Sequence, residues 1–502
     1  MSRDDPLRFN VTLASNHAFD ASHLPPNLAL FTLLYKVLVS KSRSNWAHYN
    51  KIEINPLAKS PFKSDTFSGA RFAPVSFKFE IEKEVGKARV GAISTPHGQI
   101  QTPAFIPVGT KASVKSVLPE SMRELGAQVI LANAYHLYLQ PGPDILDEAG
   151  GVAKFMNWNG PTVTDSGGFQ VLSLGVGFKK VLAMNADTFR ADDVIADNKE
   201  RLAHVDDEGV TFKSHLDGSM HRFTPEISMQ IQHKIGADIM FAFDECTTLH
   251  NTRGYQKKAL ARTHAWAIRC LDEHKRLTEL RHDKPYQALY GVIQGAQYED
   301  LRRQAAQELG AMESSGIKFD GFGIGGALDK DSLGTIVQWV NEELPTEKPK
   351  HLLGIGAPED LFVGVENGID TFDCVLASRI ARTSAVYTME GRFNVSNGPH
   401  RREFIPIEED CDCYTCRNYT RAYLNHLFRA KEMVAATLAT IHNERFIVRL
   451  VDQMRAALLD GTFQDLKSEF LGRYKHKSGQ ASDWFPDQFG VISDQSIYAP
   501  FG

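Results

Sequence analysis

Short apolar segments of β type alternate with amphipathic segments along most of the chain. The apolar segments between residues 129 and 372 are 129–133, 162–164, 238–243, 288–293, 319–324, 351–353 and 369–372. Segments with helical periodicity, roughly ten to twenty residues long, separate most of them. Further upstream, 89–95 and 99–107 flank a Pro-His-Gly turn and predict a β-hairpin. Strands that alternate with helices are typical of a parallel sheet.

A polar residue or a glycine follows the end of most of these apolar segments. The residues at six successive segment ends are Asp165, Asp244, Gln294, the pair Gly325–Gly326, Gly354 and Asp373. Ordinary turn chemistry explains Asp or Gly at any single position, but six in succession favour a common cause. In a (β/α)₈ barrel the C-terminal strand ends face one mouth, where active sites lie. We therefore predict an α/β fold, a (β/α)₈ TIM barrel.

Composition bounds the possibilities without naming a function. The 502 residues are 42% hydrophobic and carry a net charge of −5, so there is ample core material and no whole-chain basic signal for nucleic acid. The longest apolar run, 28–39, is interrupted by Lys36 and is too short to span a bilayer, so no membrane association is expected. Three of the six cysteines are scattered, which suits a reducing compartment and predicts a cytoplasmic location.

The other three cysteines form a candidate metal site with one histidine. Cys411, Cys413 and Cys416 read C-x-C-x-x-C, and His442 follows after twenty-five intervening residues. Three thiolates and one imidazole fill a tetrahedral Zn²⁺ shell, which leaves no open position for catalysis. The alternative is a reactive or buried cysteine trio with an unrelated histidine. We expect one structural zinc per subunit and look for the chemistry elsewhere.

Two carboxylates at strand ends are the candidates for catalysis. Asp165 and Asp373 could share the work of a nucleophile and a general acid/base, as in glycosyl transfer. Asp244 and Gln294 could read a donor–acceptor edge such as that of guanine. A metal-dependent barrel hydrolase is the alternative, but none of the eighteen histidines forms an H-x-H or H-E-x-x-H pattern.

Several motifs, taken in order, resemble those of one enzyme family. They are 164–170 (TDSGGFQ), 214–218 (SHLDG), 243–247 (FDECT), 293–295 (IQG), 325–326 (GG), 372–375 (FDCV) and the cysteine–histidine set. Together they resemble the tRNA-guanine transglycosylases, also called queuine tRNA-ribosyltransferases, of the bacterial type. The likeness runs from about Phe77 to about Phe463.

This resemblance implies a pentosyltransferase. The enzyme would exchange guanine at the wobble position of tRNAs with a GUN anticodon for a 7-deazaguanine. Asp373 would attack ribose C1′ as the nucleophile and form a covalent tRNA–enzyme intermediate in a double displacement. Asp165 would act as the general acid/base. The resemblance also implies a homodimer.

The resemblance assigns binding residues as well. The base would be bound by Asp165, Ser166, Gly167, Gly168, Phe169, Asp244, Gln294, Gly326 and Leu353, with Phe169 and Leu353 on its two faces. The RNA would be contacted by Gly354, Ile355, Gly356, Ala357, Pro358, Glu359, Asp360, Ser378, Arg379, Ile380, Ala381 and Arg382.

The segment 325–331 (GGALDKD) departs from the family pattern at the loop expected to face the 7-substituent of the base. The incoming base therefore stays open between 7-aminomethyl-7-deazaguanine and queuine. A second open alternative is a non-catalytic tRNA-binding partner subunit, which the presence of both Asp165 and Asp373 disfavours.

Four regions are expected along the chain. Residues 1–75 have no clear period and are predicted to form a poorly ordered N-terminal extension. The catalytic barrel should span 76–409, with a charged insertion near 177–205. The zinc-binding subdomain should follow at 410–465, and 466–502 should form a C-terminal tail. No role is assigned to the extension or to the insertion.

Overall fold

The computed structural model describes residues 77–170, 203–249, 251–326 and 331–474. All of them belong to Phe72–Gly502, the larger of two compact units of the chain. The expected N-terminal extension, residues 177–202 of the expected insertion, the loop 327–330 and the tail beyond residue 474 lie outside the described residues.

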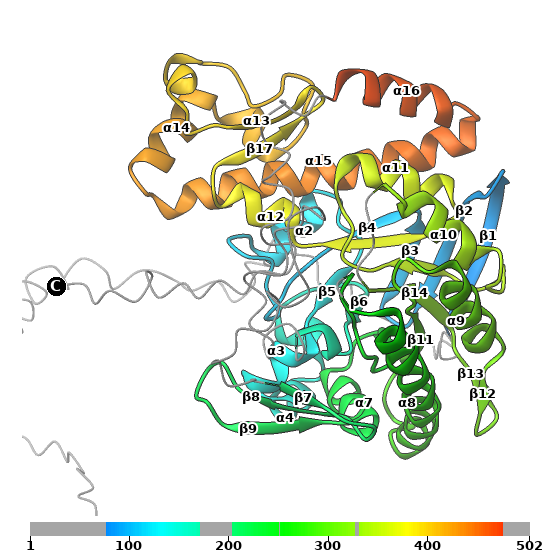
Figure 1. The fold of residues 1–502 in the computed structure, drawn as a ribbon. Coiled ribbons are helices and arrows are strands. Elements are labelled where there is room, and N and C mark those ends of the chain that lie inside the picture. Colours follow the sequence, from blue (N-terminus) through cyan, green and yellow to red (C-terminus); the bar gives the residue numbers. More distant parts are fainter. Residues whose placement is uncertain (1–76, 171–202, 250, 327–330, 475–502) are drawn as a thin grey trace, which may run out of the picture. The chain divides into compact units, whose positions relative to one another are not determined.

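Eight parallel strands close into a barrel (Figure 1). The strands are β4 (Ala104–Pro107), β5 (Ile130–Ala132), β6 (Thr162–Thr164), β10 (Ile239–Phe241), β11 (Ala288–Ile293), β14 (Gly321–Ile324), β15 (Lys350–Leu352) and β16 (Thr371–Cys374). Each strand pairs with the next barrel strand along the chain, and β16 returns to β4 with Phe372 beside Phe105. A parallel bridge between Val108 and Leu131 joins the end of β4 to β5. The predicted (β/α)₈ barrel is confirmed.

The barrel strands are buried on both faces. In β11, Ala288, Tyr290 and Val292 belong to the cluster inside the barrel, whereas Leu289 and Ile293 pack in the larger cluster shared with the helices. Successive side chains of a strand point to opposite faces, so both faces must be apolar when helices cover the outside. This is why the barrel strands appear in the sequence as continuous apolar segments.

An antiparallel sheet of β1 (Lys78–Val85), β2 (Ala88–Thr95) and β3 (Gly98–Thr102) precedes the barrel. The predicted hairpin is present, but its second strand was predicted wrongly as 99–107. The chain leaves the hairpin at Thr102, because Pro103 has no N–H to continue the ladder, and then begins the first barrel strand. Ile93 and Ile100 belong to the barrel's interior cluster, so this sheet covers one end of the barrel.

Helices follow the barrel strands on the outside (Figure 1). They are α2 (Pro119–Glu124), α3 (Ala134–Leu139), α4 (Pro143–Glu148), α5 (Val152–Phe155), α7 (Pro225–Ile235), α8 (Arg253–Leu280), α9 (Glu299–Ala311), α10 (Leu333–Asn341), α11 (Pro358–Glu366) and α12 (Leu376–Ala381). Helix α7 begins at an N-cap, since the Thr224 side chain accepts from Ile227 N at 3.3 Å and Pro225 stands at the first helical position.

Two small antiparallel sheets interrupt the alternation. Between β6 and α7 lie β7 (Ala203–Val205), β8 (Val210–Lys213) and β9 (Met220–Phe223), so the last three residues of the expected insertion form a strand. The short pair β12 (Glu313–Ser314) and β13 (Ile317–Lys318) follows α9.

The C-terminal part packs on the barrel through one long helix. Its elements are β17 (Ala385–Thr388), β18 (Gly391–Asn394), η4 (Gly398–Arg402), α13 (Tyr414–Asn418), α14 (Arg421–Arg429), α15 (Met433–Asp460) and α16 (Phe463–Arg473). Helix α15 contacts α11, α12 and β4 (Figure 1). Asn443 on α15 donates to the carbonyls of Ala377 and Ala385 at 3.1 and 3.0 Å, which ties α15 to α12 and to the first residue of β17. The expected boundary at residue 465 falls inside α16. In the described part of the chain, no helix is long and apolar enough to cross a membrane.

Candidate active site

A cavity of about 680 Å³ opens at the C-terminal ends of the barrel strands. This volume is in the range of small-molecule sites. The predicted site residues that line it are Asp165, Ser166, Phe169, Asp244, Gln294, Gly326, Leu353, Gly354, Asp373, Ser378, Arg379 and Arg382. Strands that are far apart in the sequence thus bring both candidate catalytic carboxylates to one cavity.

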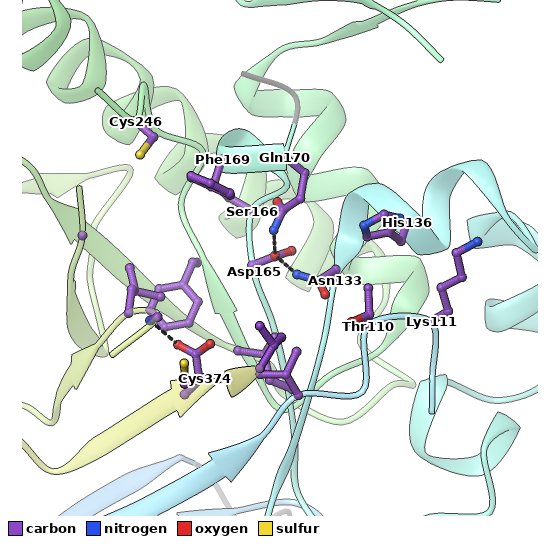
Figure 2. A pocket seen from close by; sticks show the side chains of 18 of the residues that line it. Thr110, Lys111, Asn133, His136, Asp165, Ser166, Phe169, Gln170, Cys246 and Cys374 are labelled. Atoms are coloured by element: carbon purple, nitrogen blue, oxygen red, sulfur yellow. Dashed lines mark hydrogen bonds between the residues drawn. The ribbon is translucent and has the colours of Figure 1, made fainter. Parts of the chain in front are cut away.

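Asp165 follows β6 and is held from two sides. Its carboxylate accepts from Ala134 N and Gln170 Nε2, each at 2.8 Å, and from Asn133 Nδ2 (Figure 2). Burial, together with a smaller contribution from the charge of Asp373, raises the pKa of Asp165 to about 6 in spite of these donors. A carboxyl group with such a pKa can donate or accept a proton near neutral pH.

Asp373 lies in β16 and is bound through one oxygen. Oδ1 accepts from Gly354 N at 2.9 Å and from His351 Nε2 at 3.0 Å. Thr371 Oγ1 lies 2.9 Å from His351 Nδ1, which suits the tautomer that carries its hydrogen on Nε2. With Oδ1 fixed by two donors, Oδ2 is the oxygen available to an electrophile in the cavity.

A third carboxylate, that of Asp244, lines the cavity and is buried. Asp244 Oδ1 accepts from Ser166 Oγ at 3.2 Å, and Oδ2 accepts from Gln294 Nε2 at 2.6 Å. Burial raises the pKa of Asp244 to about 6. Gln294 Oε1 is buried and has no hydrogen-bond partner among the described residues. The group therefore offers several donors and acceptors to a planar ligand and is incompletely satisfied without one.

Two predicted base-binding residues do not line the cavity. Gly167 has a φ of +79°, and a Cβ on Gly168 would lie 2.7 Å from the backbone oxygen of Asp244. Only glycines let this loop lie so close to the end of β10. They thereby bring Ser166 to Asp244 and support the site without facing it.

The predicted RNA-contacting segments are only partly at the cavity. Of 354–360, Gly354 lines it, whereas Gly356, Ala357, Pro358 and Asp360 are buried in the protein and Ile355 and Glu359 are half-buried. Of 378–382, Ser378, Arg379 and Arg382 line the cavity, and Ile380 and Ala381 are buried.

Five residues of the site were not singled out from the sequence. Asn133 stands at a strand end like the others, and His351 lies inside a strand, where an imidazole is ordinarily a packed core residue. Gln170 closes a motif that was noted for its glycines. Lys111 and Lys115 line the cavity after β4. Burial lowers the pKa of Lys115, and the nearby charges of Arg382, Arg379 and Lys111 lower it as well. The two lysines were missed because β4 was read as part of a hairpin.

The four predicted metal ligands come together in the C-terminal part. His442 Nδ1 lies 3.6 Å from the sulfur atoms of Cys411 and Cys413 and 3.3 Å from that of Cys416. Around a tetrahedral zinc, a nitrogen and a sulfur ligand lie roughly 3.5 Å apart, so the geometry fits this ion. The Tyr387 carbonyl lies 2.7 Å from His442 Nε2, which leaves Nδ1 unprotonated toward the sulfurs. All four residues are buried.

Known proteins match this chain over the barrel and the metal site. The family model described as queuine tRNA-ribosyltransferase matches residues 84–476. The queuine tRNA-ribosyltransferase of Herpetosiphon aurantiacus is 44% identical over 400 residues, which cover 80% of this chain and 93% of the relative. That of Thermoanaerobacter pseudethanolicus is 44% identical over 404 residues (80% and 99%). That of Bacillus subtilis is 41% identical over 411 residues (82% and 99%).

Proposed function

The chain belongs to the queuine tRNA-ribosyltransferase family, a family of pentosyltransferases, and we propose that it exchanges guanine at the wobble position of GUN-anticodon tRNAs for a 7-deazaguanine. The observation that carries this proposal is one cavity in which Asp165 and Asp373 accompany the Asp244–Gln294 pair. Two carboxylates suit glycosyl transfer, and the pair suits a guanine edge. A non-catalytic role as a partner subunit is disfavoured because both carboxylates are present at the cavity.

In the first half-reaction, Asp373 Oδ2 attacks ribose C1′. The bond between C1′ and guanine N9 breaks, its electron pair leaves with guanine, and an ester between ribose and Asp373 forms. Asp165 in its protonated form gives a proton to the leaving guanine. The two bonds to Asp373 Oδ1 support this role, because they fix the carboxylate without engaging the attacking oxygen.

In the second half-reaction, the incoming 7-deazaguanine binds where guanine was. Asp165, now ionised, takes the proton from N9 of this base as the nitrogen attacks C1′. The ester bond breaks and Asp373 leaves as a carboxylate. A pKa of about 6 supports this double use of Asp165, since both protonation states are accessible near neutral pH.

Base recognition would rest on complementary edges. Asp244 would accept from the N1–H and the exocyclic amine of guanine, and the Gln294 amide and Gly326 N–H would face its carbonyl oxygen. Phe169 and Leu353 would contact the two faces of the ring. Gln294 Nε2 keeps a second N–H besides the one donated to Asp244, and this N–H is the part of the amide that would face the base oxygen. The buried Oε1 is an acceptor without a partner among the described residues, which supports a polar network that these residues alone do not close.

The tRNA would enter over the cationic side of the cavity. Arg379 and Arg382, the predicted RNA-contacting residues, line this side together with Lys111 and Lys115. The negatively charged phosphate groups of an anticodon loop would be attracted to this cluster of positive side chains.

The Cys₃His site fits one zinc ion, whose role when bound would be to brace the C-terminal part. Cys411, Cys413 and Cys416 would hold the α13 segment to His442 on α15. Because α15 also contacts β4 and α12, the metal would stabilise the packing of α15 against α12, the helix that carries Arg379.

A homodimer is also proposed. The rings of Tyr419 and Tyr423, beside and in α14, stack with their centroids 5.5 Å apart. Met433, the first residue of α15, is 89% exposed. Analytical ultracentrifugation tests this proposal, since a purely monomeric protein at micromolar concentration would contradict it. A cytoplasmic location stays a prediction.

Displacement of radiolabelled guanine from a GUN-anticodon tRNA tests the function. Guanine, 7-aminomethyl-7-deazaguanine and queuine are offered in parallel, and a tRNA without the GUN anticodon is the control. We expect release with at least one deazaguanine and only from the GUN tRNA. Absence of release with every base would refute the proposed function. The preferred base decides which alternative holds for the 325–331 loop.

A further inference from the structure

Arg302 is a buried cation behind the base-binding side of the cavity. It lies on α9, its side chain is 0% exposed, and no carboxylate among the described residues pairs with it. Burial lowers the pKa of the guanidinium to about 9, so it remains charged at neutral pH. A buried charge without a counter-ion is costly, and an apolar residue of similar size would usually serve packing as well. The mechanism above leaves this cation without a role.

The guanidinium binds backbone carbonyls at the ends of two neighbouring barrel strands. Nη1 donates to Ile293 O at 2.9 Å and to Gly325 O at 2.8 Å, and Nε donates to Ala296 O at 2.8 Å. Ile293 directly precedes Gln294, and Gly325 directly precedes Gly326. One side chain therefore fixes the two peptide groups next to the two proposed base-reading residues.

The orientation of these peptide groups has a consequence for the cavity. In a trans peptide the C=O and the following N–H point in opposite directions, and the Gly325–Gly326 peptide is not among the cis bonds of the described residues. Because Arg302 holds the Gly325 carbonyl on the buried side, the N–H of Gly326 is directed away from Arg302. Gly326 lines the cavity, and its N–H makes no hydrogen bond within the described part of the chain. When a cationic group donates to the C=O of a peptide, it also polarises that peptide and makes the N–H of the same peptide a better donor.

We propose that Arg302 is a positioning residue that fixes the Gly325–Gly326 peptide so that its N–H donates to the carbonyl oxygen of the bound base. This proposal rests on the proposed function, since it takes the ligand to be a 6-oxopurine or its 7-deaza analogue. It makes Arg302 a determinant of base specificity that does not itself touch the base.

Calorimetric binding of free bases to the full-length protein, without tRNA, tests the proposal. Guanine is compared with 6-thioguanine, which keeps the donors of the same edge but replaces the carbonyl oxygen with a weakly accepting sulfur. We expect Arg302→Met to weaken guanine binding about tenfold, the loss of one hydrogen bond, and to leave 6-thioguanine binding nearly unchanged. Arg302→Lys should fall between, because one ammonium cannot reproduce the planar fork. Arg303→Met is the matched control, since Arg303 pairs with surface glutamates. This variant should keep the wild-type ratio of guanine affinity to 6-thioguanine affinity.

Equal losses for both bases in the Arg302 variants would show a merely structural role and overturn the proposal, as would no loss for either. If Arg302→Met does not fold, Arg302→Lys decides by the same ratio. A crystal structure of the wild-type protein with guanine gives an independent answer. Gly326 N should lie within about 3.2 Å of the base oxygen, and an N–H turned away from it would overturn the inference. Wild-type protein that binds neither base would instead count against the proposed function.

Discussion

Replacement of Asp244 by asparagine should change which base the enzyme accepts. The Asp244 carboxylate has two acceptor oxygens in the cavity, and guanine has two donors on the facing edge, N1–H and the exocyclic amine. An asparagine offers one acceptor and one donor, so its amide N–H would oppose a donor of guanine. Xanthine carries an oxygen where guanine carries the amine, and this oxygen would accept from the same amide.

The expected loss of kcat/KM for guanine in Asp244→Asn can be worked out from the contacts of this side chain. One hydrogen bond to a charged acceptor is lost and one donor meets a donor, which together cost roughly 2–4 kcal/mol, or about thirty- to a thousand-fold in kcat/KM for guanine. The fold should survive. Ser166 Oγ, 3.2 Å from Oδ1, can rotate to accept from the new amide, while the bond from Gln294 at Oδ2 is kept.

The stability of this variant provides a control with a defined sign. Burial raises the folded-state pKa of Asp244 from 3.8 to about 6, so the stability associated with its neutral form is present below about pH 4 and is lost as the pH rises through 6. The asparagine cannot ionise. The melting temperature of Asp244→Asn relative to wild type should therefore increase between pH 4 and pH 6 and level off above.

The assay is incorporation of radiolabelled guanine into tRNA, with unlabelled xanthine as competitor. We expect wild type to ignore xanthine and the variant to be inhibited by it. Guanine kcat/KM within threefold of wild type, together with no gain for xanthine, would refute the assignment of Asp244 to base reading.

Two further predictions concern the metal and the pH profile. Cys416→Ala should bind less than one zinc per chain by atomic absorption and melt at a lower temperature, because three ligands remain for a shell of four; full metal content with unchanged melting would contradict the ligand set. Single-turnover release of guanine should slow above about pH 6, approaching tenfold per pH unit, because Asp165 with its raised pKa must be protonated to release guanine; a flat profile between pH 5 and 8 would contradict this role.

The sequence predicts the barrel because its strands are buried on both faces and end in chemically active residues. The prediction from sequence is wrong at β4, where four apolar residues follow Pro103 and cannot be told apart from the apolar pattern of the preceding hairpin. Only the pairing of β4 with β16 distinguishes a barrel strand from a hairpin strand, and that pairing joins residues more than 260 positions apart. The loss of Lys111 and Lys115 from the predicted site followed from this error.

Residues that act through other residues were the hardest to predict. His351 stands beside Lys350 in a short buried strand and Arg302 on an amphipathic helix, and neither position has a distinctive spacing. Their contacts to Asp373 and to the Gly325 carbonyl depend on strand neighbours that the chain order does not reveal. By contrast, the Cys₃His set could be predicted because three of its ligands are local in sequence.

The most direct test of the proposed mechanism is the site of covalent attachment. Wild-type protein is mixed with a GUN-anticodon tRNA, quenched in denaturant and digested, and the RNA-linked peptide is identified by mass spectrometry. We expect a denaturant-stable adduct on Asp373 in the wild type, and no adduct in Asp373→Asn, which should still bind tRNA. An adduct on another residue, or one retained by Asp373→Asn, would contradict the assignment of the nucleophile.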